Sequence, residues 1–233
     1  KRMIVVAPTG VAAINANGVT IHSFFQLPLS PFVPESMVKP RFEYSKQKRQ
    51  IMRTLDLLII DEISMVRADI LDAIDSILRR FREHNKPFGG VQLLMIGDLQ
   101  QLTPIVKPEE EKLLSRYYNT PYFFDSKALQ STQYVTIELT KVFRQQDEVF
   151  INILNHFRNG NVTDNDFEIL NKRYQANFNP GKNSDYIHLT THNRIADNIN
   201  DRQLEQIKEK AYKFCARTEG QFPENSYPAD YEL

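Results

Sequence analysis

The chain has 233 residues, of which 41% are hydrophobic and 25% charged, a composition typical of a soluble globular protein rather than a disordered one. Its 29 basic residues balance its 29 acidic residues, so any surface for nucleic acid must be a local patch. The single cysteine, Cys215, excludes an intramolecular disulfide and fits a reducing cytoplasm. No apolar stretch approaches bilayer length and no signal peptide is recognisable, so we expect neither membrane insertion nor export.

The first predicted elements are a strand, a turn and a helix. Residues 3–7 read as a buried strand that Pro8, Thr9 and Gly10 end, and residues 11–17 read as a short helix. Four prolines between residues 27 and 40 predict an exposed loop, because proline cannot continue a helix or a central strand. A second helix is predicted over residues 44–55.

Buried strands alternate with helices in the middle of the chain. The aliphatic run LLII at residues 57–60 predicts a central parallel strand covered on both faces. Residues 67–83 place apolar side chains at helical spacing and charged ones between them, which predicts an amphipathic helix with a solvated face. Further strands are predicted at residues 91–96 and 134–139. This alternation favours a parallel α/β sheet whose ligand site lies at the carboxyl ends of its strands.

The last third of the chain has a different character. Two amphipathic helices, a polar linker, a strand and a helix are predicted in turn, at residues 149–157, 167–174, 177–184, 186–190 and 194–210. We therefore predict a first α/β domain over residues 1–145, and over residues 146–233 a helical connector with the beginning of a second α/β domain.

An adjacent pair of carboxylates, Asp61 and Glu62, follows the LLII strand directly. Asp61 would hold a hydrated Mg²⁺ beside phosphate groups, and Glu62 would orient or deprotonate an attacking water. Such a pair also arises by chance in many proteins, so its neighbours decide the interpretation. The pattern favours phosphoryl transfer.

Three further residues fit the same chemistry. In IGDLQQLTPI, Asp98 and Gln101 follow the next buried strand, where they would face the same nucleotide and Gln101 would contact the terminal phosphate. A polar turn capped by Asp98 is the plain alternative. Arg144 in ELTKVFRQ would reach the transferring phosphoryl group, although a surface arginine is the commoner reading.

A group of residues near the beginning suits single-stranded nucleic acid. Thr9 and Gly10 supply a hydroxyl and a backbone amide at a strand end, and IHSFF adds His22, Ser23 and Phe24. Hydroxyls, amides and aromatic faces together bind phosphates and unstacked bases. Taken singly, Phe24 or Phe25 is better explained as a core residue, and His22 as a buried imidazole with satisfied hydrogen bonds.

The complementary phosphate-binding loop, G-x-x-x-x-G-K-[ST], does not occur in the 233 residues. Nucleotide hydrolysis needs such a cradle for the phosphates. Its absence from this sequence bears on every functional expectation.

In order, the segments APTGVAA, VTIHSFF, LLIIDEISMV, IGDLQQLTPI, ELTKVFRQ and LTTHNRIADNIN resemble the motif series of the Pif/RecD group of superfamily-one DNA helicases, particularly its bacterial Pif-type members. The resemblance implies RecA-like P-loop NTPase domains, each a parallel sheet flanked by helices. It implies ATP and Mg²⁺ as cofactors, single-stranded DNA and duplex junctions as partners, and 5′ to 3′ movement. Repair, recombination and telomere maintenance are processes of the family.

The resemblance also assigns residues. It implies DNA contacts for Thr9, Gly10 and His22. It makes Asp61 the Mg²⁺ ligand and Glu62 the general base, and gives Gln101 and Arg144 the terminal phosphate. Further DNA contacts would come from Thr190, Thr191 and Asn193, and the proline-rich loop would occupy the place of the family's strand-separating wedge.

Family members carry the P-loop just before the position of Met3 and continue past the FPENSYPADYEL ending. The resemblance therefore implies an internal piece of a monomeric helicase of the bacterial cytoplasm or nucleoid, inactive without its P-loop. Two other hypotheses are a non-catalytic module that binds single-stranded DNA or protein with a vestigial nucleotide site, and a repair or recombination ATPase that translocates without unwinding.

Overall fold

The computed structural model describes residues 2–33, 44–178, 186–210 and 212. The second half of the predicted proline-rich loop, most of the predicted linker and Cys215 lie outside these ranges. The chain divides into two compact units, Lys1–Thr163 and Asp164–Leu233. The predicted domain boundary between residues 145 and 146 stays a prediction.

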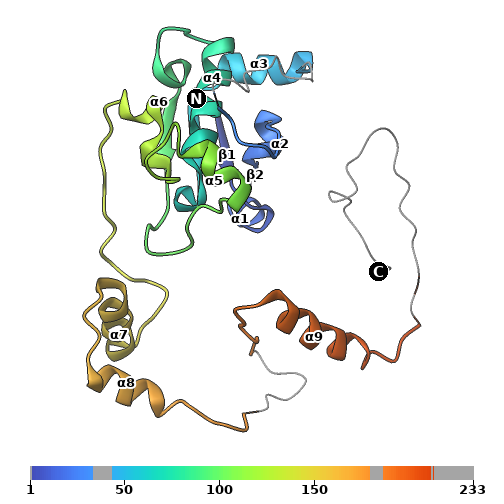
Figure 1. The fold of residues 1–233 in the computed structure, drawn as a ribbon, viewed down its shortest axis with the longest axis vertical. Helices are drawn as coiled ribbons and strands as arrows, with labels where there is room; N and C mark the ends of the chain where they lie inside the picture. Colours follow the sequence, from blue (N-terminus) through green and yellow to red (C-terminus); the bar gives the residue numbers. More distant parts are fainter. Residues whose placement is uncertain (1, 34–43, 179–185, 211, 213–233) are drawn as a thin grey trace. The chain divides into compact units, whose positions relative to one another are not determined.

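The first unit is built on a four-stranded sheet in which all neighbours are parallel (Figure 1). The strand order is β2-β1-β3-β4. The strands are β1 (Met3–Ala7), β2 (Val19–Thr20), β3 (Leu57–Ile60) and β4 (Gln92–Met95). Ile59 of β3 pairs with Val5 on one side and with Leu94 on the other, so β3 is a central strand as its aliphatic run predicts. The predicted parallel α/β class is confirmed.

Strand β4 is less buried than its sequence predicts. Leu94 is 46% exposed, and along β4 exposed and half-buried residues alternate. The cause is its place at the edge of the described sheet, where β3 is its one strand neighbour. Strand β2 has only two residues and was not predicted, because so short a strand leaves no alternating pattern to detect.

Helices of the first unit pack their apolar faces onto β3 and its neighbours. Leu71, Ile74 and Leu78 of α4 (Ala68–Phe81) are fully buried with Met52 of α3 (Lys46–Thr54), and Figure 1 shows these two helices side by side. Burying such side chains contributes roughly 1.5–3 kcal/mol each. The helical spacing predicted both elements correctly.

The charged residues of α4 do more than face water, so the predicted solvated face is only partly right. Asp69 is 1% exposed and receives two hydrogen bonds of 2.7 and 2.8 Å from Arg67. Arg67 also pairs at 2.8 Å with Glu110 of α5 (Pro108–Leu114). Asp72 accepts hydrogen bonds from the hydroxyls of Tyr118 and Ser126. Contacts at such sequence distances are invisible to helical periodicity.

The remaining elements of the first unit are short apart from α7. They are α1 (Gly10–Asn15), α2 (Ile21–Phe25), α6 (Lys127–Gln130), α7 (Glu148–Asn159), and the 3-10 turns Ile63–Met65, Pro87–Gly90 and Phe123–Asp125. The second unit contains α8 (Asp164–Asn171) and α9 (Asn193–Leu204). Predicted helices correspond to α1, α7, α8 and α9, whereas α2, α5 and α6 were not predicted. Within the described residues, no helix is long and apolar enough to span a membrane.

Two predicted strands, over residues 134–139 and 186–190, are wrong. Both segments are irregular and exposed: Ile137 is 80% and Ile187 81% exposed. The alternating pattern supplies a face to bury, but a strand also needs a neighbouring edge for its backbone hydrogen bonds. No described strand pairs with either segment.

Candidate functional site

The predicted site residues of the first unit, Arg144 excepted, gather along one edge of the sheet. Because all four strands are parallel, their carboxyl ends lie at the same edge. Along that edge, His22 follows β2, Gly10 follows β1, Glu62 follows β3 and Asp98 follows β4. This is the edge at which open parallel sheets bind ligands.

The acid pair forms a tight turn at the end of β3. The backbone N–H of Asp61 donates to the carbonyl of Val6 at 2.9 Å, which extends the pairing with β1. Glu62 has the left-handed backbone conformation, with φ 51° and ψ 45°, and its N–H donates to Oδ1 of Asp61 at 3.0 Å. A left-handed conformation is unfavourable for glutamate, so neighbouring structure must hold this turn in place.

The loop after β4 closes directly onto this turn. The N–H of Ile63 donates to the carbonyl of Ile96 at 2.9 Å. A Cβ atom at Gly97 would lie 2.9 Å from Cγ2 of Ile63 and 3.1 Å from the backbone nitrogen of Ser64. Only glycine allows the two backbones to approach so closely. The carboxylate pair and the Asp98 loop therefore form one local structure.

Asp98 organises its loop through several hydrogen bonds. Its Oδ1 accepts from the Gln100 backbone N–H at 3.0 Å, and its Oδ2 accepts from Nε2 of Gln101 at 3.1 Å. Arg158 of α7 adds a bidentate ion pair, with distances of 2.6 and 3.0 Å. Burial alone would raise the pKa of Asp98, but these hydrogen bonds and the charge of Arg158 outweigh it and lower the pKa below 3.8.

No local pattern in the sequence predicts a role for Arg158. It lies 60 residues from Asp98, and a basic residue near the end of a helix is common. No spacing rule connects the two positions. A polar turn capped by Asp98 was the alternative to a phosphate-binding role for this loop. The structure contains this cap, and Asp98 also contacts Gln101.

Thr9 and Gly10 form the turn from β1 into α1. The Thr9 hydroxyl caps the helix by accepting from the N–H of Ala12 at 3.2 Å. Gly10 is exposed, and no heavy atom lies within 4 Å of the position a Cβ would take. An approaching phosphate could therefore reach the backbone here.

His22, Ser23 and Phe24 lie in α2, directly after β2. Thr20 caps this helix by accepting from the Ser23 N–H at 3.3 Å. Burial, followed by the charge of Arg67, lowers the pKa of His22 below 6.5, while Asp69 opposes the shift. The neutral imidazole is thus favoured near neutral pH.

The structure corrects the prediction that Phe24 contacts DNA. It is only 5% exposed, packs edge-to-face on Phe25 with ring centroids 4.8 Å apart, and carries the Lys48 ammonium 4.1 Å from its ring centroid. A ring held in the core cannot stack on a base, so Phe24 is a core residue and not a DNA contact.

Arg144 follows none of the four strands directly, and the remaining predicted residues belong to the second unit. Arg144 is exposed in the irregular segment before α7, and no described residue hydrogen-bonds to its side chain. In the second unit, the Thr190 hydroxyl donates to the carbonyl of His192 at 3.0 Å, the Thr191 hydroxyl lies 2.8 Å from Nδ1 of His192, and Asn193 begins α9. Their predicted roles stay predictions.

The donor set at the acid pair fits Mg²⁺ better than a transition metal. Of the two Asp61 oxygens, Oδ1 is occupied by the Glu62 N–H, and Oδ2 accepts no hydrogen bond from a described residue. Among the described residues, no three histidine, cysteine or acidic side chains cluster as a metal cage. Mg²⁺ keeps several waters and takes few protein ligands, so one carboxylate beside phosphate oxygens suits it.

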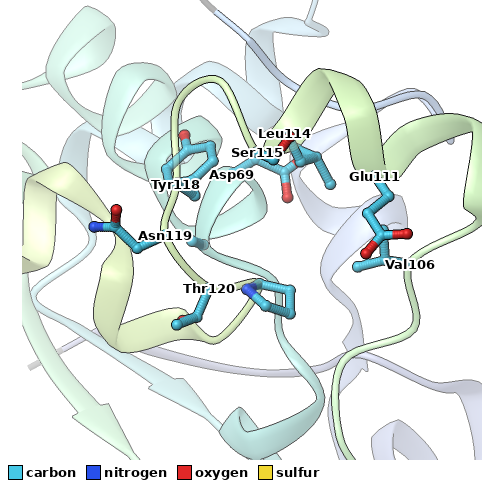
Figure 2. A pocket seen from close by; sticks show the side chains of 10 residues that line it. Asp69, Val106, Glu111, Leu114, Ser115, Tyr118, Asn119 and Thr120 are labelled. Carbon is cyan, nitrogen blue, oxygen red and sulfur yellow. The ribbon is translucent and has the colours of Figure 1, made fainter.

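A separate pocket, of about 140 Å³, lies between the start of α4, α5 and the loop that precedes residue 121 (Figure 2). Tyr118 and Asn119 lie on one side of it, and Glu111 and Val106 on the other. None of the predicted site residues lines it, and its charged lining residues, Asp69 and Glu111, are both acidic. Since none of the residues that follow the strand ends lines it, this pocket is not part of the predicted nucleotide site.

Comparison with known proteins shows the family of this chain. A family model described as PIF1-like helicase matches residues 1–168. Human "ATP-dependent DNA helicase PIF1" is 35% identical over 222 residues, which cover 91% of this chain and 32% of the relative. The corresponding protein of Saccharomyces cerevisiae is 38% identical over 165 residues, which cover 70% of this chain and 18% of the relative.

Solved structures of Pif1 helicases are also similar to this chain. "Pif1 helicase from Bacteroides in complex with ADP-AlF3 and ssDNA" is 42% identical with a TM-score of 0.87, covering 100% of this chain and 53% of that one. Pif1 helicase from Candida albicans is 34% identical with a TM-score of 0.74, covering 95% of this chain and 48% of that one. The chain thus spans about half the length of these structures. It belongs to the PIF1-like helicase family.

Proposed function

We propose that this chain carries the hydrolytic acid pair and part of the DNA-binding surface of an ATP-dependent DNA helicase that moves 5′ to 3′ along single-stranded DNA. One observation supports this most: Asp61 and Glu62 end β3 beside the Asp98–Gln101 loop that follows the adjacent strand β4. In this proposal, the metal ligand, the general base and the polar phosphate contact would come from neighbouring strand ends.

The chemistry follows from these positions. Asp61 would help hold a hydrated Mg²⁺, which would supply positive charge beside the phosphates, and Glu62 would accept a proton from the attacking water. Gln101 uses one amide hydrogen on Asp98 and keeps its Oε1 and its second N–H for the terminal phosphate or the lytic water. Arg144 supplies positive charge to the phosphoryl group once the exposed segment that carries it comes near.

The other end of the same edge is proposed to contact DNA. Thr9 and Gly10 after β1, and His22 and Ser23 after β2, offer hydroxyls, backbone groups and a neutral imidazole. The Bacteroides Pif1 structure described as bound to single-stranded DNA supports a DNA partner. A Pif1 structure described in terms of unwinding at forked double-stranded DNA supports junctions as substrates. In the second unit, Thr190, Thr191 and Asn193 are proposed as further contacts.

The phosphate-binding loop must come from sequence other than these 233 residues, which contain no G-x-x-x-x-G-K-[ST]. We therefore expect the 233-residue chain alone to be a very poor ATPase. The Bacteroides structure described as a complex with ADP-AlF3 and single-stranded DNA supports action on DNA. Action in a bacterial cytoplasm, in repair or recombination, is part of the same proposal.

The test uses the full-length product of the gene that encodes this chain. Its ATPase rate is measured with and without single-stranded DNA, alongside strand displacement on a duplex with a 5′ single-stranded tail. Asp61→Asn should lower the DNA-stimulated rate about 100-fold or more, because the Mg²⁺ would lose an anionic ligand. The matched control is Asp201→Asn, an exposed aspartate of α9.

A full-length protein without DNA-stimulated ATPase activity would contradict the proposal and favour a DNA- or protein-binding module. ATPase activity without strand displacement would favour a translocating repair ATPase. Full activity of Asp61→Asn would contradict the hydrolytic role proposed for the acid pair.

A further inference from the structure

An ion pair joins α7 to the loop that carries Gln101. Both terminal nitrogens of Arg158 contact the Asp98 carboxylate, Nη1 at 2.6 Å from Oδ2 and Nη2 at 3.0 Å from Oδ1. Two parallel bonds of this kind fix the carboxylate plane as well as its position. Side-chain exposure is 47% for Arg158 and 18% for Asp98, so solvent partly screens the pair.

The same carboxylate holds the rest of the loop. Its two oxygens also accept from the Gln100 N–H at 3.0 Å and from the Gln101 amide at 3.1 Å. An Asp98 carboxylate that turned would release both groups. Arg158 therefore fixes the amide of Gln101 indirectly, by fixing the acceptor that binds it.

The ion pair also changes the electrostatics of the edge. Asp98 follows β4, and Asp61 and Glu62 follow the adjacent strand β3, so a nucleotide there would meet three carboxylates. A bare Asp98 carboxylate repels a triphosphate more strongly than a diphosphate, because the terminal phosphate adds charge. The guanidinium of Arg158 neutralises one of the three.

We propose that Arg158 is a positioning residue, which orients Gln101 through Asp98 and makes the site selective for a nucleoside triphosphate over a diphosphate. This inference rests on the proposed function of the acid pair. Arg158 itself need not touch the nucleotide.

The full-length protein and its Arg158→Gln variant are compared by DNA-stimulated ATPase kinetics and by competition between ATP and ADP. For Arg158→Gln, kcat/KM for ATP should fall about 10-fold, the factor that corresponds to roughly 1.4 kcal/mol. The inhibition constant of ADP should change less than about twofold, since ADP lacks the phosphate that Gln101 contacts. Arg116→Gln, which removes an exposed arginine between α5 and the pocket loop, should match the wild type.

A charge-only role and a geometric role are separated by Arg158→Lys, which keeps the charge but cannot form two parallel bonds. It should recover only part of the lost kcat/KM. In Asp98→Asn, a further Arg158→Gln change should cost less than about twofold, because contacting residues are not additive. Full additivity would contradict the coupling, and equal losses for ATP and ADP would indicate a merely structural role.

The positioning role of Arg158 can be tested even if the proposed function is wrong. In that case Asp61→Asn retains full activity, or the full-length protein lacks ATPase activity altogether. The side-chain amide resonances of Gln101, recorded by NMR in the 233-residue chain, then test the positioning role alone. They should shift in Arg158→Gln and not in Arg116→Gln; unchanged resonances in both would overturn the inference.

Discussion

Glu62 combines a chemical role with an unfavourable backbone. Its φ of 51° lies in the left-handed region, where an ordinary side chain costs about 1–2 kcal/mol. The proposed general base thus lies on a strained turn, held by the pairing of Ile63 with Ile96. A strained backbone at this position is expected if the Glu62 carboxylate has a chemical role that outweighs its cost in stability.

This strain leads to a prediction with matched variants. Glu62→Asn and Glu62→Gln both remove the acid, but asparagine adopts the left-handed conformation more readily. We expect Glu62→Asn to exceed Glu62→Gln in free energy of unfolding by about 0.5–1 kcal/mol. Urea unfolding of the 233-residue chain measures the difference. If Glu62→Asn is the less stable variant, the turn is not strained as described.

His22 gives a pH dependence whose sign follows from its burial. Its pKa is lowered below 6.5 in the folded chain, mainly by burial and then by Arg67. Between the lowered value and 6.5 the unfolded chain binds more protons, so the free energy of unfolding should fall as pH drops through that range.

Urea unfolding between about pH 7.5 and 5.5 tests this prediction. His22→Gln should flatten the dependence, whereas His84→Gln, which removes an exposed histidine, should leave it unchanged. An identical slope for the wild type and His22→Gln would show that His22 does not titrate differently in the folded chain.

Individual residues show what a sequence can and cannot reveal. Asp61 and Glu62 were found because they follow four aliphatic residues, a local pattern with a physical cause. Phe24 was assigned to DNA because an aromatic residue looks the same in a sequence whether its ring is buried or exposed; the structure buries it. The contact between Asp98 and Arg158 depends on the fold and could not be predicted from either neighbourhood.

At the scale of elements, hydrophobic patterns correctly predicted the strands and helices that form by burying an apolar face. The runs at β1 and β3, and the helical spacing of α4, gave elements that the structure confirms. The alternating residues 134–139 failed because a strand also requires a partner edge, which no local pattern encodes. Helix α5 was missed because Pro108 and three glutamates begin it, a charged start without an apolar stripe.

The close approach of the β4 loop to the acid turn gives an element-scale prediction. Gly97→Ala places a methyl group 2.9 Å from Cγ2 of Ile63 and 3.0 Å from its backbone nitrogen, so the two turns must separate. The free energy of unfolding should fall by about 1–3 kcal/mol. Gly10→Ala is the control, since open space surrounds that position and the change should stay within about 1 kcal/mol. Equal stabilities for the two variants would contradict the tight packing.

At the scale of the whole molecule, the sequence order of the motifs becomes a spatial order along one sheet edge. Strand order β2-β1-β3-β4 puts the proposed DNA contacts at one end and the acid pair with the Asp98 loop at the other. Parallel pairing alone produces this alignment, which explains how residues far apart in sequence can serve one site. The sequence predicted the class of sheet, whereas the order of its strands came from the structure.

The central claim is that Glu62 acts on the attacking water and not on nucleotide binding. Its direct test is single-turnover ATP hydrolysis by the full-length Glu62→Gln protein on single-stranded DNA, with ATP affinity measured in parallel. We predict hydrolysis slowed about 100-fold or more, the range expected for loss of a general base, with ATP affinity within about threefold of the wild type. Hydrolysis at the wild-type rate, with ATP bound normally, would contradict the account.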